Sequence, residues 1–177
     1  VVLSTGEFQF SVTDLEIPGR GMPFRISRTY RSRRDGERSM LGYNWYLNYD
    51  EYIMPAITPT GTQLLYWNMG NGFSDACVWS TLSGRYEAFM GFFGRIRAQV
   101  SPPATPAGPF HIRYPDGTIK TFGTKGQISG SDVWFLTRIE DRNGNAITFH
   151  IAQPGIIDFA TDTLGRTIEF TYDTTYT

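Results

Sequence analysis

The chain has 177 residues, with 16 Lys and Arg against 17 Asp and Glu and a formal net charge of -1. A charge near zero gives no general attraction to nucleic acid, and no apolar run approaches the ~20 residues that a membrane-spanning helix needs. The single cysteine, Cys77, excludes an internal disulfide and a zinc site built from cysteines. Because 15% of the residues are aromatic and the net charge is low, the sequence favours a folded chain over a disordered one.

The N-terminal part predicts a β-hairpin followed by a second aromatic strand region. Phe8, Phe10 and Val12 alternate with polar residues and therefore share one face of a strand. A turn with one proline and two glycines spans residues 17–21, and alternation resumes from Phe24. The second region covers residues 43–53 and is rich in Tyr and Trp.

The rest of the chain also reads as short strands, and no window indicates a long amphipathic helix. The expected strands lie near residues 62–68, 76–82, 85–93, 110–114, 118–122, 133–140, 146–152, 156–161 and 166–172. Four prolines between 101 and 109 exclude helix and central strand there, so this loop is the best internal boundary. The prediction is an all-β, antiparallel fold: a β domain over 1–100, the Pro-rich loop 101–109, and β-hairpins over 110–177, arranged as a curved sheet or sandwich that leads into hairpin repeats.

An internal repeat occupies the C-terminal part. Residues 136–151 align with residues 157–172 at a constant offset of 21. The alignment places Asp141 on Asp162, Gly144 on Gly165 and Asn145 on Arg166. Each unit reads as one hairpin with an Asp-x-x-Gly turn, and because a lone hairpin cannot bury its apolar face, neighbouring copies must continue the sheet.

This repeat resembles the Rhs, or YD, repeat of bacterial polymorphic toxins and of the related teneurin shells. The resemblance rests on Asp162-x-x-Gly165-Arg166, on the alternating Ile168 and Phe170, and on the ending Tyr172-Asp173. The first copy departs from the pattern, since Asn145 replaces the Arg and His150-Ile151 replaces Tyr-Asp. Residues 4–33 and 41–53 also resemble the domain that precedes such repeats, so the resemblance covers about half of the chain, and residues 54–130 agree more in style than in motif.

The resemblance implies a non-catalytic structural role. Rhs repeats wind a long sheet into a hollow shell that encloses a toxin or other cargo, in proteins that bacteria secrete or display on the cell surface. This chain would start or cap that shell, with further repeats of the same polypeptide and the enclosed cargo as partners. Arg166 would contact a neighbouring copy and Tyr172 would cover the next hairpin, while the open strand edge at the C-terminal end would pair with the next repeat or, in isolation, self-associate.

The candidates for chemistry all favour structural roles. Asp116, Asp141, Asp162 and Asp173 could be tested as a pair of glycosidase acids, but each lies at a strand edge beside turn residues, where an Asp side chain caps its own turn. Asp141 and Asn145, with Asn143 between them, alternate as in some calcium loops, but the closing Glu of an EF-hand is missing. We therefore expect no enzyme activity, no metal and no cofactor.

The three remaining candidates for chemistry also read as structural. Two are the histidines, His111 and His150, which fall inside predicted strands. The third, Cys77, lies in an apolar run and reads as a small buried hydrophobe.

An alternative function is an extracellular module that binds a glycan or a receptor through exposed aromatic residues. Alternation leaves Tyr46 and Tyr52 as the rings available for a ligand, although aromatic residues in alternating strands more often belong to the core. The loop that contains Arg31, Arg33 and Arg34 reads first as a solvated loop. Its sharper interpretation is a docking surface for an acidic partner or for another part of the shell.

Overall fold

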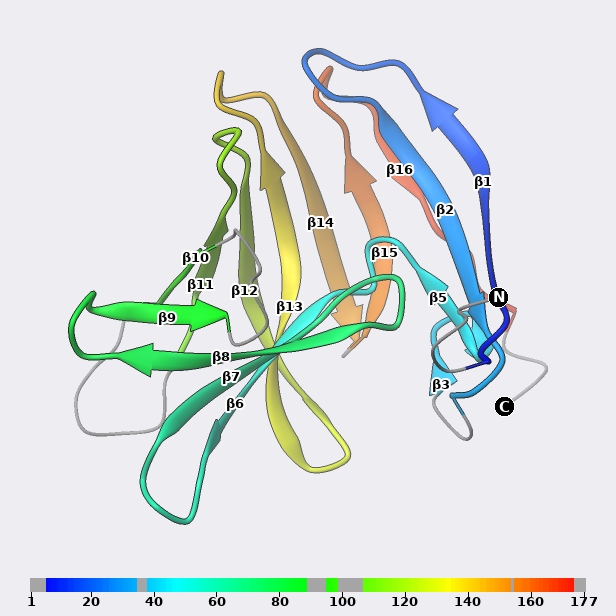
Figure 1. Ribbon diagram of the computed structural model, residues 1–177. Helices are drawn as coiled ribbons and strands as arrows, with labels where there is room; N and C mark the ends of the chain where they lie inside the picture. Colours follow the sequence, from blue (N-terminus) through cyan, green and yellow to red (C-terminus); the bar gives the residue numbers. More distant parts are fainter. Residues whose placement is uncertain (1–5, 35–37, 89–94, 99–106, 154, 174–177) are drawn as a thin grey trace.

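The computed structural model describes residues 6–34, 38–88, 95–98, 107–153 and 155–173. The described residues form sixteen β-strands and no helix, and every strand pair is antiparallel (Figure 1). The prediction of an all-β antiparallel fold is confirmed. The described part of the chain accordingly has no helix long and apolar enough to cross a membrane.

The N-terminal residues form a small sheet of their own. Strands β1 (Gln9–Ile17), β2 (Phe24–Arg31) and β5 (Trp45–Leu47) pair in the order β1-β2-β5, and the two short strands β3 (Arg38–Ser39) and β4 (Gly42–Tyr43) pair with each other. The register of β1 against β2 shifts between Thr13 and Leu15, which is a β-bulge. A bulge of this kind strengthens the local twist of the strand.

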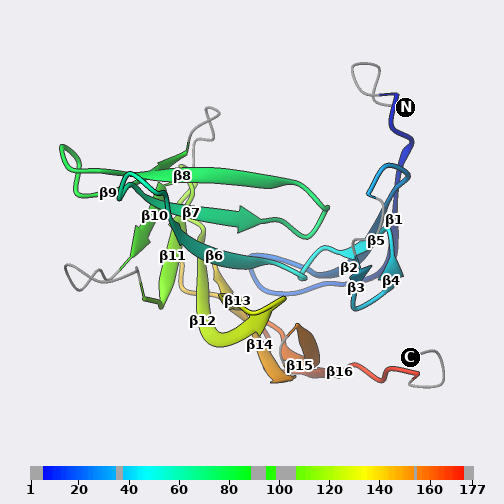
Figure 2. The same ribbon diagram turned by 90° about the horizontal axis from the view of Figure 1, so that it is seen from below.

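The second sheet has eleven strands, and part of it closes on itself. Its first members are β6 (Tyr52–Ile57), β7 (Gln63–Asn68), β8 (Ser74–Ser80), β9 (Arg85–Ala88), β10 (Arg95–Ala98), β11 (Phe110–Arg113), β12 (Ile119–Ile128) and β13 (Ser131–Glu140). Each pairs with the next, and β13 returns to pair with β6, so that β6 to β13 form a closed ring. Figure 2 shows β6, β7 and β8 crossing the direction of β11, β12 and β13.

Strand β13 belongs both to the ring and to the part of the sheet that continues beyond it, because two different strands pair along the same edge of β13. Trp134 and Phe135 face β6, whereas Arg138 to Glu140 face β14 (Ala146–Gln153). Strands β15 (Ile156–Thr161) and β16 (Thr167–Glu169) then continue the sheet outwards. The first repeat, 136–151, is therefore the outer half of β13 with β14, and the second repeat, 157–172, is β15 with β16.

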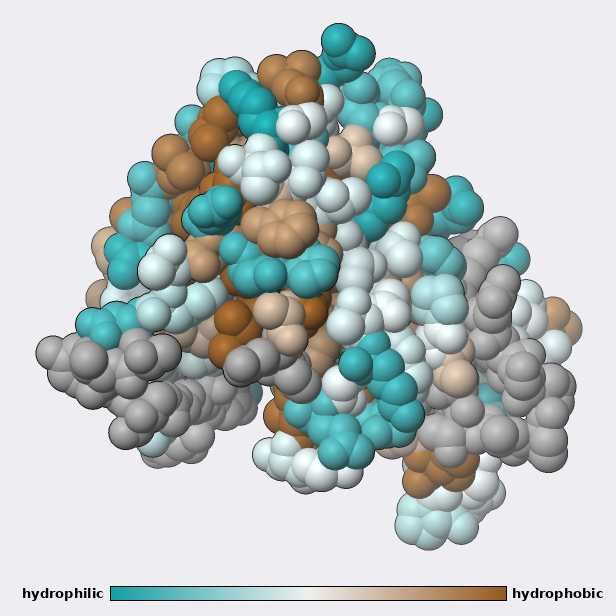
Figure 3. All heavy atoms as spheres, turned by 180° about the vertical axis from the view of Figure 1, so that it is seen from behind, coloured by the Kyte–Doolittle hydropathy of each residue, from teal (hydrophilic) through white to brown (hydrophobic). Residues whose placement is uncertain are grey.

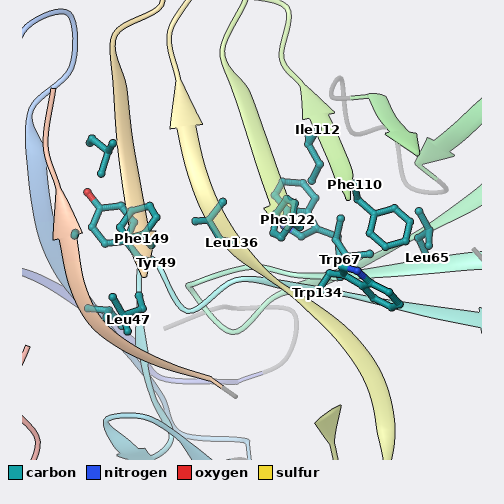
Figure 4. Packing of buried hydrophobic residues seen from close by; sticks show 14 of the residues in the cluster. Leu47, Tyr49, Leu65, Trp67, Phe110, Ile112, Phe122, Trp134, Leu136 and Phe149 are labelled. Carbon is teal, nitrogen blue, oxygen red and sulfur yellow. The ribbon is translucent and has the colours of Figure 1, made fainter. Parts of the chain in front are cut away.

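One continuous hydrophobic core fills the ring and reaches the N-terminal sheet. Leu65, Trp67, Phe110, Phe122 and Trp134 are buried within the ring (Figure 4). The same cluster includes Phe24, Leu47 and Tyr49 from the N-terminal part, and the Tyr49 and Phe149 rings lie 4.6 Å apart between their centroids. These contacts join the N-terminal part to the first repeat, because β14 carries Phe149.

The expected boundary at 101–109 does not coincide with a boundary between sheets. Residues 99–106 lie outside the described residues, but β10 before this segment pairs directly with β11 after it. The expected strand 85–93 is described only as far as Ala88. Cys77 is buried in the core, as its apolar surroundings predicted, and burial raises the pKa of its thiol to about 12.

Candidate functional site

The two repeat turns belong to a set of hairpin turns with one backbone geometry. In each turn the first residue donates its N–H to the carbonyl of the fifth, and the fourth donates its N–H to the carbonyl of the first. The fourth residue is a glycine with positive φ, as in a type I turn followed by a glycine bulge. Among the described residues this turn occurs at 58–62, 69–73, 114–118, 141–145 and 162–166.

An aspartate at the first position sets the last two turns apart. The Asp141 carboxylate accepts hydrogen bonds from the backbone N–H of Asn143 and Asn145, at 2.8 and 2.9 Å, and from the Asn145 side-chain amide at 2.7 Å. Asp162 accepts the equivalent bonds from the backbone of Leu164 and Arg166, both at 2.9 Å, and from Arg166 Nε at 2.7 Å. Asn145 and Arg166, at equivalent positions of the two repeats, therefore each donate a side-chain hydrogen bond to the aspartate of their own turn.

These hydrogen bonds hold both carboxyl groups in the charged form. The side-chain hydrogen bond from Asn145, with the backbone bonds of the turn, lowers the pKa of Asp141 despite some desolvation. Burial acts in the opposite direction at Asp162, but the bonds from Arg166 and the backbone outweigh it and the pKa is lowered. Both aspartates are thus occupied by their own turns, as Asp116 is by the backbone N–H of Thr118, at 2.9 Å.

Both repeat turns dock onto the turn between β1 and β2. Arg166 Nη2 donates to the Pro18 carbonyl, and the N–H of Arg20 donates to Thr163 Oγ1 at 2.7 Å. The approach is so close that a Cβ on Gly21 would lie 2.1 Å from Asp141 Oδ2. A Cβ on Gly19 would lie 2.5 Å from Thr163 Oγ1. The absence of side chains at Gly19 and Gly21 therefore lets the repeat turns approach the first hairpin closely, a role that the sequence did not indicate.

Arg166 and Tyr172 both make contacts within this chain, and their expected contacts with a following hairpin stay a prediction. Arg166 pairs with Asp162 of its own turn, at 2.6 Å, and with the N-terminal hairpin rather than with another repeat. Tyr172 turns back on its own unit, donating its hydroxyl to the Ile157 carbonyl at 2.8 Å, and also lies against Met40. Burial raises the pKa of the Tyr172 hydroxyl to about 12.

The outer edge of β16 ends the large sheet. Among the described strands, none pairs with β16 on the side away from β15. The N–H of Phe170 donates to the Asp158 carbonyl at 2.9 Å, so alternation along the strand directs the N–H groups of Thr167 and Glu169 outwards. Asp173, the last described residue, is exposed just beyond this strand. The outer edge of β16 is therefore unpaired among the strands that the structure describes.

An aromatic row with two exposed rings lies on one face of the N-terminal sheet. Phe10 is paired with Tyr30 and Tyr30 with Trp45, so these side chains share one face of the sheet. Phe24 lies on the same face, at even spacing from Tyr30, and is fully buried, whereas Phe8 and Phe10 are each 49% exposed. We call Phe8, Phe10, Tyr30 and Trp45 the β1 aromatic row. Figure 3 shows that hydrophobic and hydrophilic residues are mixed on the face of the molecule seen from behind.

The arginine segment is only partly a surface loop, which corrects the sequence interpretation. Arg31 is 4% exposed and makes a two-pronged ion pair with the buried Glu7, with distances of 3.0 and 2.6 Å. It also donates to the Gly72 carbonyl at 2.6 Å, and its guanidinium lies 3.8 Å from the centre of the Phe73 ring. The hydrogen bond from Arg31 lowers the pKa of Glu7. Arg33 is exposed and Arg34 is half-buried.

A pocket of about 420 Å³ gathers three of the residues that were singled out as a possible ligand surface. Arg34, Tyr46 and Tyr52 all line it, together with Asp50, Asn68 and Phe73. We call this the junction pocket, because it lies where the N-terminal sheet meets β6, the β7–β8 turn and the β12–β13 turn. Tyr46 itself is buried, so the expected open platform of tyrosines is replaced by a walled pocket.

A buried ion pair near the ring had no sequence signal. Glu51 accepts a hydrogen bond from Lys120 Nζ at 2.6 Å and one from Trp67 Nε1 at 3.1 Å. Lys120 also lies over the Trp67 and Tyr114 rings, 5.6 and 5.7 Å from their centres. Only the approach of two segments 69 positions apart creates this cluster. Burial raises the pKa of Tyr114, with the Glu51 charge adding to the effect.

The histidines are placed in strands as predicted. His111 Nδ1 lies 3.1 Å from Thr121 Oγ1, and exposed His150 pairs with Asp158 at 2.7 Å and stacks on Phe159. Across the described ranges, no group of three or more His, Cys, Asp or Glu residues is placed to hold a metal ion.

The N-terminal part of the chain matches a known family. Residues 1–72 match a family described as a domain of unknown function, DUF6531, which covers the chain from its first residue to the glycine of the β7–β8 turn. No curated protein matches the chain.

Proposed function

We propose that this chain is a non-catalytic structural segment that starts or caps an Rhs-type β-shell. The shell would enclose a toxin or other cargo in a bacterial protein that is secreted or displayed on the cell surface. The partners of the segment would be further repeats of the same polypeptide and the enclosed cargo. The role is mechanical and calls for no cofactor.

The observation that carries this proposal is the open edge of β16 directly after two equivalent hairpins. Both hairpins have the same Asp-capped turn, and the second ends in the Tyr172-Asp173 pair. A third hairpin with this pattern would accept hydrogen bonds from the outward N–H groups of Thr167 and Glu169. Without such a partner, an edge strand leaves these groups open to pairing with another chain.

The docking of the repeat turns supports a starting role for the N-terminal part. The β1–β2 turn contacts the turns of both repeats, through Gly21 at the first and through Pro18 and Arg20 at the second. It thereby aligns the N-terminal sheet over the outgoing strands, and β2 overlies β16 in Figure 1.

The β1 aromatic row supplies a reason for further repeats to follow. The face that carries it is already buried at Phe24, where it packs on the common core. A hairpin added beside β16 would extend the second layer beneath the exposed Phe8 and Phe10 rings. Covering large aromatic side chains stabilises such an assembly, because burial of apolar surface is favourable.

Peptide mapping combined with the intact mass of the natural polypeptide tests this proposal. We expect the polypeptide to continue past Thr177 into many Asp-x-x-Gly-Arg units that end in Tyr-Asp. Electron microscopy of the same polypeptide should then show a hollow particle. A natural polypeptide that stops near Thr177 would overturn the proposal, since no shell could follow.

A further inference from the structure

We propose that the junction pocket binds a saccharide. The pocket is enclosed by parts of the chain that are far apart in sequence: Arg34 after β2, Tyr46 and Tyr52 around β5 and β6, Phe73 before β8, and Ser129 between β12 and β13. This inference concerns a small ligand and is independent of the proposed role in a shell.

Three aromatic rings form apolar walls whose positions are set by the protein. The Tyr46 ring packs against the backbone of Gly72, where a Cβ would lie 2.6 Å from the ring. The Arg31 guanidinium lies over the Phe73 ring, and the Tyr52 ring lies 6.1 Å from that of Phe135. A sugar ring has a flat C–H face that packs on such rings, and because they are already held in place, binding costs little side-chain entropy.

The polar side chains of the pocket match the hydroxyl groups of a sugar. The Asp50 carboxyl group offers acceptor oxygens and, when protonated, one donor, and Asn68 offers both an acceptor and two donors. Ser74 adds a hydroxyl group that can donate or accept, whereas the Ser39 hydroxyl already donates to the Trp45 carbonyl and accepts from the Leu41 N–H. A ligand with several hydroxyls around an apolar ring can use such mixed donors and acceptors, whereas a purely apolar ligand would leave them without partners.

The charges of the pocket favour a neutral ligand. Arg34 and Asp50 both line the pocket, and above about pH 7, where the Asp50 carboxyl is ionised, their opposite charges give neither a phosphate nor an organic cation a field of one sign. The nearby Arg31 is already paired with Glu7. The volume of about 420 Å³ lies within the range of small-molecule sites and is large enough for a monosaccharide or disaccharide.

Saturation-transfer NMR on the 177-residue chain tests the proposal. The probes are glucose, galactose, N-acetylglucosamine and their disaccharides, with inorganic phosphate and glycine as an anion and a zwitterion. We expect transfer to at least one saccharide and none to phosphate or glycine. Tyr52→Ala should weaken saccharide binding at least tenfold, and Asn68→Ala should weaken it several-fold.

Two matched variants control for unspecific effects. Tyr43→Ala removes a tyrosine that is 65% exposed and does not line the pocket. Asn143→Ala removes an exposed asparagine side chain in the first repeat turn. Both should bind the saccharide as the wild type does. If Tyr52→Ala fails to fold, Asn68→Ala still tests the proposal, because it shortens only a half-buried side chain.

Three results would overturn the proposal. The first is the absence of transfer to every saccharide in the panel. The second is saccharide binding that Tyr52→Ala and Asn68→Ala leave unchanged. The third is binding of phosphate or glycine in place of saccharide, which would assign the pocket to another ligand. None of these results bears on the shell, which is tested by the continuation of the polypeptide.

Discussion

Gly21 lies where the N-terminal hairpin meets the first repeat, and two separate demands fall on it. Its φ is +76°, a conformation that side chains with a Cβ rarely adopt. A Cβ there would also lie 2.1 Å from Asp141 Oδ2 and 2.6 Å from Asn145 Nδ2. The second constraint comes from the docked repeat turn. A substitution at Gly21 therefore tests how much this docking contributes to the stability of the fold.

Gly21→Ala should destabilise the chain by about 1–3 kcal/mol more than Gly61→Ala does, because it adds overpacking at a docked turn. Gly61 is the matched control, since its φ is +84° and no atom lies within 4 Å of an added Cβ. Both variants bear the cost of positive φ, roughly 1–2 kcal/mol. Urea unfolding of the two variants and the wild type measures the difference. Equal losses would show that the docking contributes nothing to stability.

Asp50 predicts a pH dependence of unfolding. Burial, partly offset by the backbone hydrogen bond from Met40, raises the pKa of its carboxyl from 3.8 to about 7. Between these values the folded state binds more protons than the unfolded state, so this group contributes a stability that is lost as the pH rises from about 4 to about 7. Asp50→Asn cannot ionise and should therefore gain in Tm relative to the wild type across that interval.

Thermal unfolding at pH 4, 6 and 8 checks this expectation, with Asp132→Asn as the control. The hydrogen bond from Lys125 lowers the pKa of the exposed Asp132, so its removal should not stabilise the chain at any of these pH values. A difference in Tm between Asp50→Asn and the wild type that stays constant from pH 4 to pH 8 would contradict the prediction.

At the scale of elements, the two repeat hairpins differ at one position with a clear structural effect. Asn145 closes the first turn by bonding to Asp141 alone, whereas Arg166 bonds to Asp162 and also reaches the Pro18 carbonyl. The longer side chain thus fastens the second hairpin to the N-terminal one. The first turn reaches the same hairpin through close packing against Gly21.

Arg166→Asn should lower the free energy of unfolding by about 1 kcal/mol, the typical contribution of one hydrogen bond. The variant keeps the turn cap that Asn145 makes in the first repeat but loses the bond to Pro18. Arg142→Asn, which changes an exposed arginine in the first turn, is the matched control and should be neutral. Urea unfolding that shows the same loss for both variants would remove Arg166 from this role.

The β16 edge predicts that the isolated chain self-associates. Its outward N–H groups, and the exposed Phe8 and Phe10 rings of the β1 aromatic row, are available to a second molecule. Glu169→Pro removes one outward N–H without removing a bond to β15, so it should reduce association. Sedimentation velocity over a concentration series checks this, and Ile168→Pro, which removes an inward N–H, should instead destabilise the hairpin. A wild-type chain that stays monomeric at high concentration would contradict the prediction.

At the scale of the whole molecule, the strands and their turns followed largely from local sequence. Alternation and Gly-rich turns indicated the first hairpin and the two repeats, and the offset of 21 identified equivalent residues that make equivalent hydrogen bonds. Asp-x-x-Gly is a local signal, because the carboxylate, the turn amides and the glycine lie within five residues of each other.

The pairing of distant strands could not be predicted in this way. The ring closes where Ile53 faces Trp134, and the pattern of alternation in β6 and β13 suits many other partners equally well. The same holds for the sites. Tyr46 appeared available for a ligand and is buried, Arg31 appeared solvated and is paired with Glu7, and the Glu51–Lys120 pair had no signal at all.

The sequence by itself determined the all-β class, the hairpin repeat, and the role of Asp141 and Asp162 as turn caps, because each depends on residues close together in the chain. Only the tertiary structure decided that β6 to β13 close into a ring, that the repeat turns dock on the first hairpin, and that Arg34, Tyr46 and Tyr52 share a pocket. The physical reason is that these features arise from packing between distant segments. Burial of apolar surface favours such packing without encoding the choice of partners in any local pattern.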